Sequence, residues 1–374
     1  MNQQFLAGMV FFAIFTSIYT LLHWPIFSHT ALALGLGRPG RWILRLLLAL
    51  LILGPLIHGL TGNQVSPTAM ITYLWMAMAF YLFLAGLILI PVRLLVSAKA
   101  FGLIWLTVVL AAGLTVGSGF LQARQITVRE VSLTSPKPGP ETEEIRIALI
   151  SDLHLHSVES HTRLERLIRV LEPLNYDLLI SIGDLIEAGL DRAEWRSLAQ
   201  RLAGIKPRLG KYAVFGNHEY YAERFGGDGF AQRFHEEAGF IVLRQEAELV
   251  AGLIQLVGLD DPAFGLGRNK ARTMELNLLQ RLDPKLPIIL LKHQPQVEET
   301  SLSLFDLQLS GHTHGGQIWP FNYLVETRFP RYRGLHDLGG GSSLFVSTGT
   351  GTWGPPVRVG AQAEVILIRL KAGG

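Results

Sequence analysis

The chain has 374 residues and a mean hydropathy of +0.31, and only 17% of its residues are charged. It is too apolar for an ordinary soluble protein, whose surface has to be largely polar. It contains no cysteine, which excludes disulfide bonds, thiolate zinc sites and a cysteine nucleophile.

The charged residues are distributed unevenly along the chain. Residues 1–123 contain no Asp or Glu and only five cations, whereas the remainder carries 28 Lys and Arg against 30 Asp and Glu. The basic balance of the whole chain, formally +3, therefore belongs to its apolar N-terminal part. It does not indicate a nucleic-acid-binding surface, and we expect no nucleic-acid partner.

Four apolar runs occupy residues 1–123, and each approaches or exceeds the roughly 20 residues with which an α-helix crosses a bilayer. Runs without charge do not supply the polar outer face that a soluble helical bundle needs. The sequence therefore predicts a membrane domain, residues 1–123, with about four transmembrane helices and the lipid bilayer as a partner. A cleaved signal peptide is the alternative for the first run, although no basic segment precedes it. The runs are residues 5–22, 42–60, 69–92 and 100–123.

The few cations of this domain predict its orientation. Arg38, Arg41 and Arg45 mark the first connection, and Arg93 and Lys99 mark the third. Positively charged loops tend to remain in the cytoplasm. We therefore expect both ends of the membrane domain, and everything that follows it, on the outer side.

Residues 124–143 are predicted to form a linker, because prolines and a glycine cluster at 135–140. From 144 to 374, apolar runs first alternate with amphipathic helical patterns and later follow one another through short turns. That order predicts sheet covered by helices, with some antiparallel pairing. The main strands are expected at 145–151, 177–182, 211–215, 287–292 and 307–310.

Each of these five strands ends in residues that can bind a metal ion. Asp152 and His154 lie two residues apart after the first, as do His312 and His314 after the last, so each pair shares a face of its strand. Polar groups at the carboxyl ends of strands are expected to form a site. The full set is Asp152, His154, Asp184, Asn217, His293, His312 and His314.

Two aspartates, one asparagine and four histidines are too many donors for one ion. Mixed carboxylate and imidazole ligands suit first-row metals such as Zn, Fe or Mn better than calcium. Two ions that share a bridging carboxylate form a clamp suited to phosphoryl transfer. The set therefore predicts a dinuclear site.

The motifs DxH, GD, GNHE, an isolated His and GHTH follow one another here in the order found in the calcineurin-like metallophosphoesterases. The chain resembles that family over about residues 145–370. The resemblance implies a four-layer αββα sandwich of class α/β (α+β) and a metal-dependent phosphoric ester hydrolase. It also implies two divalent ions, Mn, Zn, Fe or Mg, and a phosphodiester, pyrophosphate or phosphomonoester of a small molecule or lipid as substrate.

The resemblance assigns roles to the motif residues. Asp184 resembles the bridging carboxylate, and His218 the histidine that, with Asn217, binds phosphate and protonates the leaving group. Glu187 and Glu219 stand where many relatives have Asp. The implied ligands are Asp152, His154 and His314 for the first metal, and Asn217, His293 and His312 for the second.

The GHTHGGQ and GNHEYY forms and the apolar N-terminal part resemble a membrane-anchored branch of the family. That branch includes phosphodiesterases and the pyrophosphatases that cleave UDP-2,3-diacylglucosamine in lipid A synthesis. It implies a location in the bacterial inner membrane. An extracytoplasmic catalytic domain, however, excludes a cytoplasmic lipid A precursor as substrate. A membrane sensor or transporter regulated by a phosphate-binding domain is the alternative from another functional class.

Overall fold

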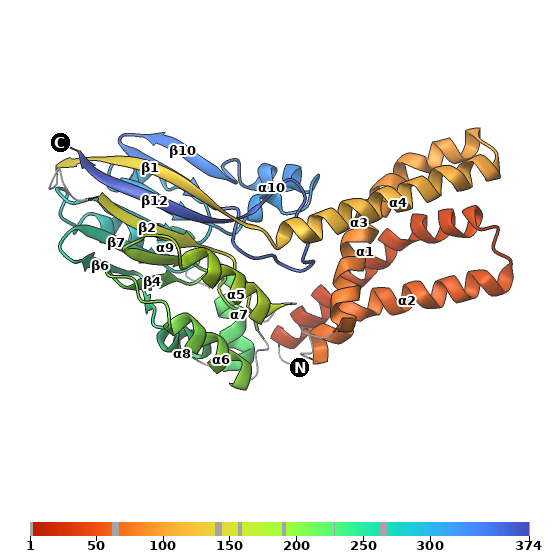
Figure 1. Ribbon diagram of the computed structural model, residues 1–374, viewed down its shortest axis with the longest axis horizontal. Coiled ribbons are helices and arrows are strands. Elements are labelled where there is room, and N and C mark those ends of the chain that lie inside the picture. The colour runs from red at the N-terminus through yellow and green to blue at the C-terminus, as the bar shows by residue number, and fades with distance from the viewer. Residues whose placement is uncertain are drawn as a thin grey trace. The chain divides into compact units, whose positions relative to one another are not determined.

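The computed structural model describes residues 3–61, 67–138, 144–155, 159–188, 192–227, 229–261 and 268–373 (Figure 1). The chain divides into two compact units. We call them the N-terminal unit, Met1–Leu121 with Gly354–Val357, and the C-terminal unit, Gln122–Trp353 with Arg358–Gly374.

The N-terminal unit contains long helices at the four apolar runs of the sequence, where transmembrane helices were predicted. Two helices, over Thr68–Leu95 and Ala98–Ala123, are long and apolar enough to cross a membrane, with mean hydropathies of 2.2 and 2.1. Only 17% and 22% of the most apolar 18-residue window of each helix is buried, whereas a core helix of a soluble fold is mostly buried. The membrane spans themselves stay a prediction for all four helices. The bounds are α1 (Gln3–Ala33), α2 (Arg38–Thr61), α3 (Pro67–Leu95) and α4 (Ala98–Ala123).

The C-terminal unit contains a first six-stranded sheet in the order β1-β12-β2-β3-β4-β5. Strands β2 to β5 are parallel, β12 is antiparallel to β2, and β1 is parallel to β12. The bounds are β1 (Ile126–Pro138), β2 (Glu144–Ile150), β3 (Leu178–Ile182), β4 (Lys211–Val214), β5 (Ile241–Val242) and β12 (Ala363–Gly373).

A second six-stranded sheet has the order β10-β11-β9-β8-β7-β6. Its four central strands are parallel, and the two edge strands β10 and β6 are antiparallel to their neighbours. The bounds are β6 (Glu246–Val250), β7 (Ile254–Leu259), β8 (Ile288–Lys292), β9 (Leu307–Ser310), β10 (Gly334–Gly339) and β11 (Ser342–Val346).

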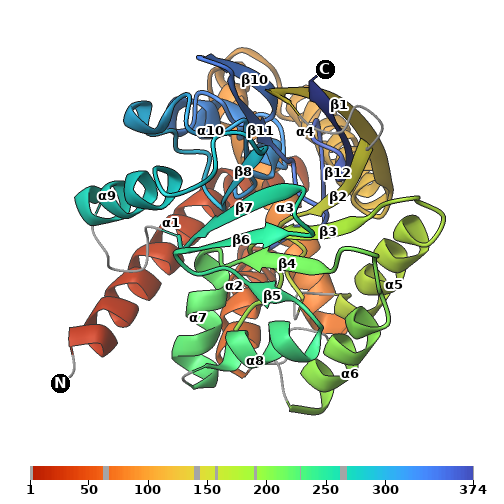
Figure 2. The same ribbon diagram turned by 90° about the vertical axis from the view of Figure 1, so that its left-hand side faces the viewer.

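Alternation along the strands builds the layers, because successive side chains point to opposite faces of a sheet. In β2, Ile147 and Leu149 join a core between the sheets, to which β8 and β9 contribute Leu291 and Leu309. Ala148, which points to the opposite face of β2, packs instead against helices α5, α6 and α8. Helix α9 packs on the outer face of the second sheet. The C-terminal unit is therefore the predicted αββα sandwich (Figure 2).

The helices of this unit connect the strands or follow the site loops. Helix α5 begins at Ser160 and α6 at Arg192, in the part of the chain where amphipathic helical patterns alternate with strands. The bounds are α5 (Ser160–Leu171), α6 (Arg192–Ala203), α7 (Asn217–Gly226), α8 (Phe230–Glu237), α9 (Arg268–Leu279) and α10 (Asn322–Arg328), with single 3-10 turns η2 (Glu299–Ser301) and η3 (His314–Gly316).

The structure differs from the sequence-based interpretation at the predicted linker, residues 124–143. Residues Ile126–Pro138 form the edge strand β1, paired in register with β12 from Ile126 opposite Ala363 onward. An edge strand tolerates the missing N–H groups of proline, which explains how this proline-rich segment joins a sheet. Residues 139–143 lie outside the described part of the chain.

Candidate metal centre

Residues from both sheets meet at the carboxyl ends of their strands. The first sheet contributes Asp152 and His154 after β2, and Asp184 after β3. Asn217 begins α7 directly after β4. The second sheet contributes His293 after β8 and the pair His312 and His314 after β9. Asp152, His154, Asp184 and His293 are each at most 2% exposed, and His314 is 8% exposed.

One group of potential ligand atoms joins Asp152, His154 and His314. The Nε2 atoms of His154 and His314 lie only 3.0 Å apart, and the second is 3.5 Å from Asp152 Oδ1. Two imidazole nitrogens facing each other need a shared proton or a cation between them. The group therefore fits a metal ion.

A second group joins Asp184, His293 and His312. His293 Nε2 lies 3.1 Å from Asp184 Oδ2 and 3.2 Å from His312 Nδ1. The same Asp184 oxygen is 3.9 Å from His154 Nε2, which belongs to the first group. Asp184 thus lies between the two groups, where a bridging carboxylate would have to be.

Hydrogen-bond acceptors on the far side of two imidazoles determine which nitrogen faces the site. His293 Nδ1 lies 2.6 Å from the carbonyl oxygen of Ile182, and a carbonyl oxygen can only accept a hydrogen bond. His154 Nδ1 lies 2.9 Å from Glu187 Oε1. Both contacts favour a proton on Nδ1 and leave Nε2 as the ligand atom. Glu187 therefore orients His154.

Electrostatics favour positive charge at the centre of the cluster. Burial alone raises the pKa of Asp184, but His293, His218 and His154 together outweigh it and hold the pKa well below its usual range. Burial lowers the pKa of His293, yet Asp184, with Asp152 and Asp261, raises it well above its usual value. Burial, reinforced by the charge of His293, lowers the pKa of His312 to about 4. Two buried carboxylates, Asp152 and Asp184, lie among the imidazoles, and their negative charge would favour a bound cation.

The backbone at the site adopts a conformation that costs energy. Five of the seven predicted ligands have positive φ angles, between 49° and 70°. This left-handed region is unfavourable for residues other than glycine, and such residues concentrate at functional sites. The five are Asp152, His154, Asp184, His312 and His314.

Two motif glycines allow this close packing. A Cβ atom on Gly216 would collide with Asp184, and one on Gly311 would collide with Ser151 and Asp152. Gly311 belongs to the second sheet and Asp152 to the first, so the glycine lets the two loops touch. Because these two glycines have no side chain, the loops that carry the predicted ligands can approach one another closely.

Glu219 holds the Asp184 loop in place. Its carboxylate accepts hydrogen bonds from four backbone N–H groups, those of Asp184, Leu185, Ile186 and Gly216, at 2.7 to 3.2 Å. Burial, with repulsion from Asp184, raises the pKa of Glu219 to about 7. The sequence left this glutamate without a role, whereas the structure shows that it joins the GD and GNHE loops.

Two buried arginines, Arg163 and Arg358, brace the remaining loops and were missed by the sequence analysis. Arg163 donates to the carbonyl oxygens of Leu153 and His154 at 2.8 and 3.1 Å. Arg358, which is fully buried, donates to the carbonyl oxygen of His314 at 3.5 Å and to several carbonyls of residues 348–362. Burial lowers the pKa of each to about 10, so both are charged at neutral pH.

His218 stands beside the cluster and contacts exposed aromatic side chains. Its backbone N–H donates to Asp184 Oδ1 at 2.8 Å, and its ring centroid lies 4.8 Å from that of His154. The rings of Tyr221 and Trp353 lie 5.5 and 6.3 Å away. His218 is thus close to the cluster yet only partly buried, which agrees with its predicted role of binding phosphate.

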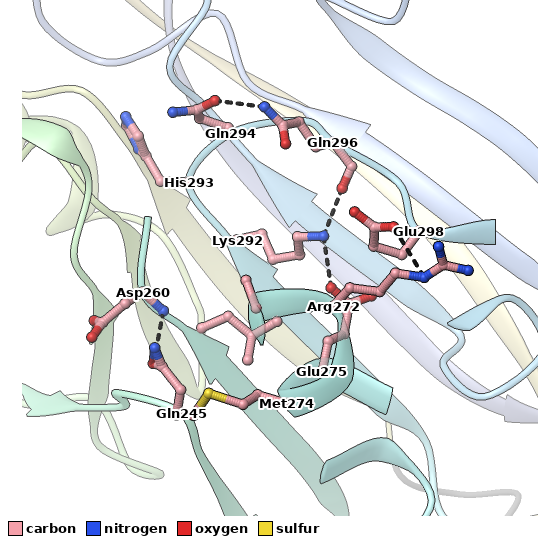
Figure 3. Close-up of a pocket in the computed structure, with 12 residues that line it drawn as sticks. Gln245, Asp260, Arg272, Met274, Glu275, Lys292, His293, Gln294, Gln296 and Glu298 are labelled. Carbon is pink, nitrogen blue, oxygen red and sulfur yellow. Dashed lines mark hydrogen bonds and ion pairs between the residues drawn. The ribbon is translucent and has the colours of Figure 1, made fainter. Parts of the chain in front are cut away.

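A pocket lined by Lys292, His293 and Gln294 lies at the end of β8 (Figure 3). Lys292 extends into it and is held by Glu275 Oε2 at 2.8 Å and by the carbonyl oxygen of Gln296 at 2.7 Å. Gln294 donates to the carboxylate of Asp261. The residues on either side of His293 are therefore fixed, which directs His293 toward the other ligands.

The donor set fits divalent metal ions. Asn217 Oδ1 is buried and accepts no hydrogen bond from the described part of the chain, as expected of a ligand atom without its ion. The imidazole nitrogens converge, and carboxylate oxygens lie among them. Ligands of this mixed type suit first-row divalent metals.

Comparisons with known proteins agree with this geometry. A model of the calcineurin-like phosphoesterase family matches residues 145–316. An uncharacterized metallophosphoesterase of Aquifex aeolicus is 36% identical over 256 residues, which are 68% of this chain and 94% of the relative.

Two vertebrate proteins described as transmembrane proteins with a metallophosphoesterase domain are also similar. The one from Danio rerio is 30% identical over 74% of this chain, and the one from Bos taurus 31% over 68%. The matched parts are 64% and 59% of those relatives, less than two thirds of their length. The chain belongs to the calcineurin-like phosphoesterase family, and it is accordingly a metal-dependent phosphoesterase.

Proposed function

We propose that the protein is a membrane-anchored phosphoesterase that holds two divalent ions and hydrolyses a phosphodiester or pyrophosphate bond of a lipid-linked substrate. The observation that carries the proposal is the position of Asp184 between two ligand groups, 3.1 Å from His293 and 3.9 Å from His154. Asp152, His154 and His314 would hold one ion. Asn217, His293 and His312 would hold the other, with Asp184 shared.

Bound divalent ions would lower the pKa of water and neutralise charge on the phosphoryl oxygens. The chain's own residues would do the rest. Asn217 and His218 would orient the phosphate, and His218 would give a proton to the leaving oxygen, which an imidazole can do near neutral pH. Glu219 and Arg358 would keep the loops rigid, so that little reorganisation accompanies the reaction.

A membrane anchor and a lipid-linked substrate are supported by α3 and α4, which are long and apolar enough to cross a bilayer. Because basic loops tend to remain in the cytoplasm, the C-terminal unit would lie outside it. Because the natural chain has no cysteine, Gln64→Cys and Ser97→Cys provide a clean test with an impermeant thiol reagent. We expect labelling of intact cells at position 64; labelling at 97 alone would reverse the orientation.

The reaction itself can be tested on the detergent-solubilised full chain. We would strip it with chelator, restore Mn²⁺, and compare a chromogenic phosphodiester with the corresponding phosphomonoester. The proposal expects metal-dependent hydrolysis with preference for the diester. If neither ester is hydrolysed although metal is bound, a narrow lipid substrate or the sensor role becomes the better interpretation; preference for the monoester would exclude the proposed bond type.

A further inference from the structure

A run of exposed apolar side chains follows directly after the His312–His314 loop. Trp319, Phe321, Tyr323 and Leu324 are 52%, 46%, 59% and 62% exposed. Helix α10, on which two of them lie, has no buried residue. Exposed apolar residues are ordinary when scattered, but a contiguous group marks an interaction surface. We call these four residues, with Trp353, the aromatic surface.

The aromatic surface is attached to the metal-binding loop. Thr313 Oγ1 donates to the carbonyl oxygen of Tyr332 at 2.6 Å, which ties the chain after α10 back to the loop. The ring of Phe329, which follows α10, lies 5.3 Å from the ring of His312. The surface is therefore a structured extension of the site.

Trp353 extends the surface to the predicted proton donor. The side-chain amide of Gln317 both donates to the carbonyl oxygen of Trp353, at 2.9 Å, and accepts from its N–H, at 3.0 Å. The indole is 57% exposed, and its ring lies 6.3 Å from that of His218. A molecule bound at the aromatic surface would consequently be close to the group that meets the leaving oxygen.

Three exposed arginines border the surface. Arg328, Arg331 and Arg333 form no ion pair with a carboxylate in the described part of the chain, and Arg328 and Arg333 lie over the rings of Phe329 and Tyr332. Trp and Tyr concentrate at the headgroup level of membranes, and basic side chains there attract anionic phosphates. This combination fits a lipid surface better than a purely apolar protein partner.

The C-terminal unit is connected to a candidate membrane span by a very short segment. Helix α4 ends at Ala123 and β1 begins at Ile126, so only two residues separate a candidate membrane span from the catalytic fold. A short connection of this kind maintains a high local concentration of the C-terminal unit at the membrane.

We propose that the aromatic surface lies in the headgroup region of the bilayer, with the three arginines on anionic phosphates, so that lipid phosphoesters enter the site from the membrane plane. The contact with lipid is independent of the reaction. Only its consequence, that the substrate comes from the bilayer, rests on the proposed function.

The test uses the full-length protein in vesicles and needs neither metal nor substrate. Leu324→Cys and Leu249→Cys are matched variants, because both leucines are exposed, 62% and 53%, and Leu249 lies on β6, outside the aromatic surface. Each is labelled with an environment-sensitive fluorophore and reconstituted in phosphatidylcholine–phosphatidylglycerol vesicles. Brominated acyl chains should quench the label at 324 about twofold or more relative to the label at 249.

Equal quenching at both positions would overturn the proposal. Energy transfer between donor- and acceptor-labelled copies at 324 that persists on dilution with excess lipid would also overturn it, and would identify the surface as a contact between copies. Neither result would bear on hydrolysis of a water-soluble phosphodiester, so failure of the surface and failure of the reaction are distinguishable.

Discussion

The two sheets of the C-terminal unit contribute different predicted ligands to the site. The first sheet supplies all the oxygen donors, Asp152, Asp184 and Asn217, with His154 as its one imidazole, whereas the second supplies imidazoles alone. Each half also depends on the other. The N–H of His312 donates to Asp152 at 3.0 Å, and His293 Nδ1 contacts the carbonyl oxygen of Ile182 across the sheets.

This difference shows where charge and rigidity come from. The first half carries the negative charge that attracts cations, and its carboxylates accept hydrogen bonds from backbone N–H groups, Asp184 from that of His218 and Asp152 from that of His312. The second half carries imidazoles alone, and the orientation of His293 depends on an acceptor in the first half, the carbonyl oxygen of Ile182. We therefore expect changes in the first half to abolish metal binding, and changes in the second to weaken it.

The largest effect is expected for Asp184→Asn. The amide keeps the shape of the side chain but removes the charge that lies between both ligand groups. We expect phosphodiester hydrolysis to fall by about 10³-fold, beyond the 10- to 100-fold typical of groups that only orient a ligand. Metal content should fall with it. Asp337→Asn, at an exposed position on β10, is the control and should retain activity.

A smaller loss is expected for His312→Ala in the second half. One neutral donor disappears while every carboxylate stays, so an ion can still bind with lower affinity. We expect activity to drop by about 10²-fold and to recover partly when the Mn²⁺ concentration is raised. His161→Ala removes an exposed imidazole of α5 and serves as control. A loss that no metal concentration restores would contradict the expected division of roles.

Glu219→Gln tests how the first half is held. The amide replaces one of the two oxygens by an NH2 group, so two of the four backbone N–H groups lose their acceptor and the Asp184 loop should shift. Metal affinity should fall by about 10- to 100-fold, as for other groups that orient ligands. Isothermal titration of the chelator-stripped protein measures this, with the exposed Glu248→Gln as reference. Unchanged affinity would mean that the loop keeps its conformation without this carboxylate.

The smallest expected effect is on the pH dependence of folding stability, through the buried His235 of α8. His235, fully buried and 4.0 Å from Glu219, has its pKa lowered by burial from 6.5 to about 4. Between these values the unfolded chain binds the proton and the folded chain does not, so stability is lost as pH falls from about 6.5 to 4. The loss amounts to about 3 kcal/mol at most.

His235→Phe removes the titrating group in a pocket that already contains Phe215 and Phe240. In this variant the melting temperature of the metal-free protein should depend less on pH between 6.5 and 4. An unchanged pH dependence would show that the imidazole is protonated within the fold.

The sequence predicted the parts of the fold that rest on local patterns. The apolar strands β2, β3, β4, β8 and β9 begin and end within one or two residues of the predicted positions, and the αββα sandwich is confirmed. The residues after those strands do meet in space, as their position at strand ends indicated. Their roles as ligands stay predictions.

Features that depend on distant partners were not predictable in this way. Strand β1 looks like a proline-rich linker because its partner β12 lies at the other end of the domain, with Thr127 opposite Glu364. Arg163 and Arg358 look like ordinary surface cations until the structure buries them among carbonyl oxygens. The role of Glu219 depends on a loop 35 residues away.

The most direct test of the account counts and characterises the metal ions of the full-length protein. The chelator-stripped chain is titrated with Mn²⁺, and bound metal and the electron paramagnetic resonance spectrum are recorded together. The account predicts two ions per chain with an exchange-coupled spectrum, which Asp184→Asn abolishes. One ion per chain, or two magnetically isolated ions that persist in Asp184→Asn, would contradict a centre bridged between the two sheets.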